Sequence, residues 1–207
     1  MDSTTLLGSY RLLDHPFYRR WEEGTLLEGE LAQYAAQYRF FEAQLPTYLS
    51  ALLEITETPA QSRLVDANLA DEIAGDSTHL ELFDRFAAAV HAPRAIEMSP
   101  AMAALVQTYE RALETGDTAY CLGVLAGYEV QAAEVAATKG ESLATHYGVT
   151  EEGLEFWNLH AELETDHAAW TLEAAEGLDT ERVVDGSQAS ASAWWAYLDE
   201  REALVAC

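Results

Sequence analysis

Apolar residues recur at intervals of three and four along most of the chain, which is the spacing of one face of an α-helix. The alternation of apolar and polar residues that is typical of strands is not evident, so the pattern predicts an all-α fold. Because no linker or internal repeat interrupts the pattern, residues 1–207 are expected to form a single helical domain. The expected helices cover residues 4–13, 16–21, 28–55, 59–74, 78–91, 100–115, 118–146, 150–175 and 188–205.

Proline, glycine and short polar residues set the boundaries between these helices. Asp117 is a good N-cap for the helix that follows it, and Ser187 can cap the last helix. The segment 177–186 is polar and has glycine at both ends, so it is expected to be a loop. Pro46 should bend the long helix in which it lies, and Gly140 is a weak point in another.

The charge of the chain limits what it can bind. It carries 36 acidic residues against 11 basic ones, for a net charge of −25, and Lys139 is its only lysine. This balance argues against nucleic acid or an anionic membrane as a partner, and it resembles the acidic, lysine-poor surfaces of proteins from extreme halophiles. Most of the acids are therefore expected to face solvent, and only acids inside apolar stripes carry information about a site.

Two further features bear on where the protein works. The sequence has no signal peptide and no apolar run near the ~20 residues of a membrane span, so a cytoplasmic protein is expected. Its two cysteines, Cys121 and Cys207, allow at most one disulfide, and nothing in the sequence requires even that one.

The most informative stretch lies in the helix expected over residues 150–175. His160, Glu164 and His167 stand at i, i+4 and i+7, so they share one helix face that is otherwise apolar and aromatic. Two imidazoles and a carboxylate on one face are typical metal ligands. The alternative is a solvated helix with two surface histidines.

Three other residues carry chemistry where apolar side chains would be expected. Glu129 interrupts a stripe of leucine and alanine, and a carboxylate there is costly to bury unless it is paired or bound to a metal; the alternative is that this alanine-rich face meets solvent. Glu72 and His79 lie seven residues apart across Gly75. Taken alone, this pair is better explained by a surface glutamate and a core histidine bonded to a carbonyl group.

Together these residues make three carboxylates and three histidines, the ligand inventory of a carboxylate-bridged dinuclear site. Three negative charges offset most of the charge of two divalent cations. Nitrogen and oxygen ligands without a thiolate suit iron or manganese better than structural zinc. Helix bundles build such sites from side chains on facing helices.

Three segments that contain these residues resemble the metal motifs of the haem-oxygenase-like di-iron oxygenases: NLADEIAGDSTH, YEVQAAEVAATK and EFWNLHAELETDH, in that order. HPFYRRWEEGTL near the start is similar to the branch of this family around the chlamydial protein associating with death domains, which makes para-aminobenzoate. The resemblance implies a seven-helix fold, O₂ activation, oxidation of an organic substrate, and a cofactor of two iron ions or one iron and one manganese. The residues that match family ligands are Glu72, His79, Glu129, His160 and His167, with Glu164 where the close branch usually has Asp.

In that branch the substrate is a tyrosine of the protein's own chain, and a lysine supplies the amino group. Tyr18 matches the tyrosine and Lys139 matches the lysine, so the resemblance implies that these two residues are catalytic. The plain alternatives are a core aromatic for Tyr18 and an exposed residue near a helix end for Lys139. Lys139 is ten residues beyond Glu129, about 15 Å along a straight helix, so it is expected to reach the metals only if the helix bends or breaks before Gly140.

Other functions stay open at this stage. A relative of the thiaminase type would use a cysteine nucleophile and no metal, and a quinone-cofactor synthase of the same fold would not need all six ligands. A non-enzymatic interaction protein and an iron store are further alternatives. O₂ and a small-molecule or self-derived substrate are the expected partners, and the oligomeric state is open, with a homodimer as one option.

Overall fold

Helices make up the regular secondary structure of the computed structural model, which describes residues 1–73, 75 and 77–204. The all-α prediction is therefore confirmed. The described residues form nine α-helices and one 3₁₀ helix, which agrees with the nine helices expected from the pattern but not with the seven that the family resemblance implies. The elements are α1 (Ser3–Leu7), η1 (Leu12–Asp14), α2 (Pro16–Glu22), α3 (Glu28–Ile55), α4 (Pro59–Ile73), α5 (His79–Ala89), α6 (Pro100–Glu114), α7 (Thr118–His146), α8 (Glu151–Ala174) and α9 (Thr180–Ala203).

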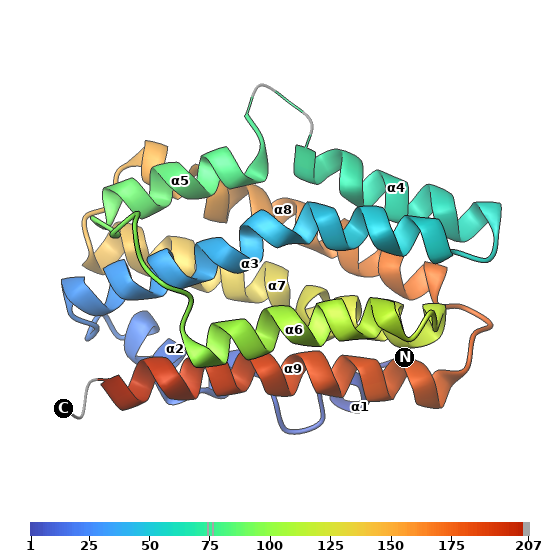
Figure 1. The fold of residues 1–207 in the computed structure, drawn as a ribbon. Helices are drawn as coiled ribbons and strands as arrows, with labels where there is room; N and C mark the ends of the chain where they lie inside the picture. The colour runs from blue at the N-terminus through green and yellow to red at the C-terminus, as the bar shows by residue number, and fades with distance from the viewer. Residues whose placement is uncertain (74, 76, 205–207) are drawn as a thin grey trace.

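The long helices lie alongside one another (Figure 1). In this view α4 and α5 run along one side of the molecule and α9 runs along the other, with α3, α7 and α8 between them. α7 packs against both α8 and α9, whereas α4 and α5 each pack against α3 and α8. The inner faces of α3, α4, α5, α7 and α8 therefore converge in the middle of the bundle.

The first helix is shorter than expected. Gly8 adopts a left-handed backbone conformation, with φ of +56°, and ends α1 after Leu7. The chain then forms the short helix η1 instead of continuing to Leu13. Asp117, in contrast, caps α7 as predicted, because its side chain accepts a hydrogen bond from the backbone N–H of Tyr120.

The expected loop over residues 177–186 is wrong over most of its length. The side chain of Asp179 accepts hydrogen bonds from two backbone N–H groups, and α9 begins directly after it, at Thr180. Gly186 is a helix-packing residue, because a Cβ atom there would lie 2.2 Å from the carbonyl oxygen of Tyr120. Gly127 of α7 likewise lies against the carbonyl of Ser187. The predicted helix ends at residues 74 and 205 lie outside the described residues.

α3 continues through Pro46 and α7 continues through Gly140, so neither residue ends its helix. Across residues 1–73, 75 and 77–204, no helix combines the length and the apolarity needed to cross a membrane.

Candidate metal centre

The face of α8 that carries His160, Glu164 and His167 is buried, so the alternative of two surface histidines is wrong. The Nδ1 atom of His160 lies 2.8 Å from the backbone carbonyl oxygen of Phe156. A carbonyl oxygen can only accept a hydrogen bond, so Nδ1 carries the proton. Nε2 therefore keeps a free electron pair. Burial, with His79 close by, lowers the pKa of His160 well below its usual value, so this ring is neutral and ready to bind a metal.

Glu129 is buried on α7, as its place in the apolar stripe predicts. The side-chain amide of Asn68 on α4 donates to its Oε1 atom at 2.7 Å. Its second oxygen, Oε2, has no hydrogen-bond partner among the residues that the structure describes. Burial raises the pKa of this carboxyl group, which is the expected cost of a carboxylate with one unsatisfied oxygen in an apolar interior.

Glu72 and His79 come from the end of α4 and the start of α5, and both are buried. The interpretation of Glu72 as a surface residue is therefore wrong. Nδ1 of His79 lies 3.0 Å from Oε2 of Glu72. The two atoms are close but not aligned as a hydrogen bond, and Nδ1 is otherwise unpartnered within the described part of the chain. We therefore interpret this contact as two ligand atoms that face a common point.

The remaining distances bring the histidines of α5 and α8 together. The ring centres of His79 and His160 are 4.5 Å apart, and those of His79 and His167 are 6.5 Å apart. Nδ1 of His167 lies 3.8 Å from Oε2 of Glu164. Burial raises the pKa of Glu164 well above its usual value, and the nearby carboxylates of Glu129 and Glu72 add to the rise. The structure thus gathers all six sequence-predicted residues in one buried cluster.

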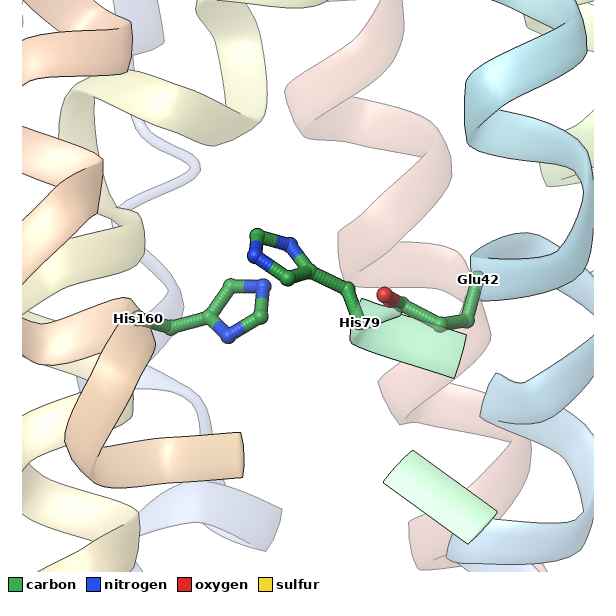
Figure 2. A group of neighbouring side chains, drawn as sticks. All are labelled: Glu42, His79 and His160. Carbon is green, nitrogen blue, oxygen red and sulfur yellow. The ribbon is translucent and has the colours of Figure 1, made fainter. Parts of the chain in front are cut away.

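A seventh residue of the cluster, Glu42 on α3, was not predicted from the sequence. It is 3 % exposed, and its carboxylate and the rings of His79 and His160 place ligand atoms within 4.8 Å of one another (Figure 2). The sequence does contain a pattern that could have identified it. Glu42 stands four residues after Tyr38 and seven before Leu49, which places it on an apolar helix face, and both neighbours are buried in the structure. The argument that selected Glu129, a carboxylate on an apolar helix face, applies equally here.

Two polar residues of α4 contact the candidate ligands from outside the cluster. Asn68 orients Glu129, as described above, and the carboxylate of Asp71 lies 3.3 Å from Nε2 of His167. Partners of this kind fix the rotation of a metal ligand and raise its basicity. Neither residue was selected from the sequence, because a polar residue beside a ligand motif in a highly acidic chain carries no distinctive pattern.

The cluster fits a pair of divalent metal ions. Three carboxylate oxygens in it are buried without a hydrogen-bond partner in the described ranges: Oε1 of Glu42, Oε2 of Glu129 and Oε2 of Glu164. Burying such oxygens is costly unless a cation or a donor meets them. A donor set of imidazole nitrogens and carboxylate oxygens without thiolate suits iron or manganese.

Beside this cluster lies a second one, built from tyrosines and the single lysine. The hydroxyl oxygens of Tyr18 and Tyr34 are 2.7 Å apart, and Nζ of Lys139 donates to the Tyr34 hydroxyl at 2.7 Å. The same Nζ lies 4.5 Å from the centre of the Tyr18 ring and 4.4 Å from that of Trp157. Lys139 is 1 % exposed, so its interpretation as an exposed residue near a helix end is wrong.

Lys139 reaches this position from α7, which continues without a break through Gly140. Burial lowers the pKa of Lys139 well below its usual value, against the opposing effect of Glu42. Burial therefore favours the uncharged amine of Lys139, whose nitrogen faces the aromatic rings around it.

The cysteine nucleophile of a thiaminase-like reaction finds no support at Cys121. Its side chain is fully buried, and burial raises the pKa of the thiol to about 11. At neutral pH this group stays a thiol, and a thiol is a poor nucleophile.

Comparison with known proteins gives consistent results for fold and family. A domain with a haem-oxygenase-like fold from Shewanella denitrificans superimposes with a TM-score of 0.80 at 15 % identity, covering 98 % of this chain and 90 % of that one. A CADD-like protein of unknown function from Nostoc punctiforme gives 0.78 at 16 % identity over 96 % and 93 % of the two chains. The family model described as "Iron-containing redox enzyme" matches residues 32–200.

Sequence relatives are more similar than the solved structures. A protein of Chlamydia pneumoniae named 4-aminobenzoate synthase is 31 % identical over 195 residues, which cover 90 % of this chain and 87 % of the relative. A protein of the same name from Nitrosomonas europaea is 30 % identical over 215 residues, covering 94 % and 87 % of the two chains.

Proposed function

We propose, given that this chain belongs to the haem-oxygenase-like family of iron-containing redox enzymes, that it is a dinuclear iron oxygenase that makes 4-aminobenzoate. Family membership makes the protein a redox enzyme with iron as its cofactor. The product is inferred from the names of its relatives and from the chemistry of the second cluster. O₂ is the co-substrate, and the ring comes from the chain itself.

The proposed ligands of the two metal ions are the six residues selected from the sequence. They are Glu72, His79, Glu129, His160, Glu164 and His167. Their burial, their proximity and their unpartnered oxygens support this assignment. Two iron ions, or one iron and one manganese, fit the same donor atoms.

The observation that carries the proposed product is the contact between Tyr18 and Lys139. A phenol ring with a primary amine 4.5 Å from its centre, both sealed from solvent, holds the two parts of 4-aminobenzoate side by side. Tyr34 accepts a hydrogen bond from the amine and bonds to the Tyr18 hydroxyl, so it fixes the relative position of the two groups. An ordinary core has no reason to place its only lysine among five aromatic rings.

The conversion has a defined chemical balance. The Cα–Cβ bond of Tyr18 breaks, Cβ is oxidised to the carboxylate, and Cα stays in the backbone and takes up a hydrogen. Nζ of Lys139 forms a bond to the ring carbon while the phenolic oxygen leaves as water. The Nζ–Cε bond breaks, and Cε is oxidised to an aldehyde. O₂ is the oxidant and an external reductant supplies electrons, so each chain makes one molecule of product. When bound, the metal pair supplies O₂ activation and one-electron oxidation.

The remaining steps belong to residues of the chain. Tyr34 can pass a proton between the phenol of Tyr18 and the amine of Lys139, because it is hydrogen bonded to both. The surrounding rings, Trp21 and Trp157 among them, exclude water, which would compete with the amine for an oxidised ring.

Two variants test this proposal. Tyr18→Phe and Lys139→Arg should each abolish 4-aminobenzoate formation with Fe²⁺, reductant and O₂, while both still bind two metal ions. Mass spectrometry of the wild-type protein should show loss from the peptide that contains Tyr18. Tyr48→Phe is the matched control, because Tyr48 is also a buried tyrosine of the core but bonds only to the backbone carbonyl of Cys121. Undiminished product from the Tyr18 or the Lys139 variant would show that the enzyme acts on a free small molecule instead.

A further inference from the structure

Glu42 is the buried acid that the proposed ligand set leaves unused. It projects from α3 toward His79 of α5 and His160 of α8 (Figure 2). Its Oε1 atom has no hydrogen-bond partner among the described residues, although the carboxylate is buried. We propose that Glu42 is a seventh protein ligand of the metal centre, and that it holds one of the two metal ions together with His79 and His160. The inference deepens the proposed function and rests on it.

Geometry supports a ligand at this position. The three residues each offer a ligand atom within 4.8 Å of the other two, a spacing that a single metal ion at their centre satisfies. They come from three different helices, which is the usual way that metal sites are built in helix bundles. The helix face of Glu42 also carries Tyr38 and Leu49, both buried, so the carboxylate has no path to solvent.

A simpler role for Glu42, as the counter-ion of Lys139, does not fit the contacts. Within the described residues, the hydrogen bond of the lysine amine goes to Tyr34, and Oε1 of Glu42 has no hydrogen-bond partner. Burial lowers the pKa of the amine, which weakens its attraction for the carboxylate. A buried carboxylate oxygen without a hydrogen-bond donor needs a positive partner close to it, and two histidines that offer ligand atoms within 4.8 Å indicate a metal ion.

Charge balance gives an independent reason for a fourth carboxylate. Two divalent ions bring four positive charges into a region without solvent contact, and neutral histidines compensate none of them. Three carboxylates, those of Glu72, Glu129 and Glu164, leave one positive charge uncompensated. With the carboxylate of Glu42 added, the two metal ions and their ligands are neutral together. A neutral centre avoids most of the cost of transferring a net charge from water into the interior of the protein.

The inference predicts that the two metal positions differ in their dependence on Glu42. Metal-free protein, prepared with a chelator, is titrated anaerobically with Fe²⁺ and, separately, with Mn²⁺, and bound metal is counted by mass spectrometry after desalting. The wild type should bind two ions per chain. Glu42→Gln, which keeps the shape and removes the charge, should bind one ion normally and the second at least tenfold more weakly. Glu54→Gln, with the same charge change at an exposed position of α3, should bind two.

Thermal unfolding of the metal-free proteins serves as the second readout. Metal-free Glu42→Gln should be as stable as metal-free wild type or more so, because an unpartnered buried carboxyl group is removed. If Glu42→Gln does not fold, Glu42→Asp takes its place and should again weaken the second ion. A Glu42 variant that binds two ions as tightly as the wild type overturns this inference alone. A wild-type chain that binds no metal overturns both this inference and the proposed function.

Discussion

Replacing Lys139 with methionine tests whether the lysine is present for chemistry or for the stability of the fold. Methionine matches the length of the lysine stem and removes only the amine. In the structure this amine makes one hydrogen bond, to the Tyr34 hydroxyl, which also bonds to Tyr18 and so keeps a partner after the change. If Lys139 is present for chemistry, the protein should be at least as stable without it.

The size of the effect follows from two opposing contributions. Loss of the hydrogen bond costs about 1 kcal/mol. Against this, the lysine is charged in the unfolded chain at pH 7, whereas burial lowers its pKa in the folded protein. Each pKa unit of difference between the two states destabilises the folded protein by up to about 1.4 kcal/mol, and methionine removes this cost. Lys139→Met should therefore raise the free energy of unfolding, and the melting temperature should rise by roughly 2–4 °C for each kcal/mol gained in a chain of this size.

The assay is urea unfolding of metal-free protein at pH 7, purified without O₂ so that Tyr18 remains intact. Gln131→Met is the matched control on the same helix. Gln131 accepts from the backbone N–H of Leu12 at 2.8 Å and donates to the carbonyl of Gly127, so its replacement should cost about 1–3 kcal/mol. If Lys139→Met lost stability in parallel with Gln131→Met, the lysine would be structural and our reasoning about its role would be refuted.

Three further outcomes are expected. Gly127→Ala should destabilise the fold by about 1–3 kcal/mol in thermal unfolding, because the new Cβ atom would lie 2.3 Å from the carbonyl oxygen of Ser187. An unchanged melting temperature would contradict the close packing of α7 and α9. Asn68→Leu should weaken iron binding about 10- to 100-fold in the anaerobic Fe²⁺ titration, because Glu129 loses the hydrogen-bond donor that orients it. Unaltered affinity would show that Asn68 does not support the metal site. Iron affinity should rise as pH increases above the usual titration range of a glutamate, because burial raises the pKa of Glu129 and Glu164 and their protons must leave before a metal binds. A flat profile by competition titration would contradict this order of events.

The helices and most of the metal cluster could be predicted because each depends on local spacing. The i, i+4, i+7 motif of α8 places its ligands on one face whatever the rest of the chain does. Glu72 and His79 were ambiguous in the sequence, since their convergence depends on how the chain turns between α4 and α5. That turn is a tertiary feature that no helical periodicity encodes.

The errors have physical causes of the same kind. The segment 177–186 is polar and rich in glycine, which is typical of a loop. Its glycine at position 186 instead allows α9 to approach the backbone of α7. Glu42 belongs to none of the three motifs, so its place on an apolar helix face was not used, and the folded chain brings its carboxylate close to two histidines. Lys139 was expected to reach the metals only if α7 bends or breaks before Gly140; α7 is continuous there, and the amine lies 4.5 Å from the centre of the Tyr18 ring.

The most direct test of the account uses the presence of a single lysine in the chain. Protein made with lysine labelled with ¹⁵N at Nζ carries the label only at Lys139, and ring-deuterated tyrosine labels Tyr18 in the same molecules. After reaction with Fe²⁺, reductant and O₂, the account predicts 4-aminobenzoate that contains both the ¹⁵N atom and the deuterated ring, at no more than one molecule per chain. Product with unlabelled nitrogen or an unlabelled ring, or several turnovers per chain, would contradict it.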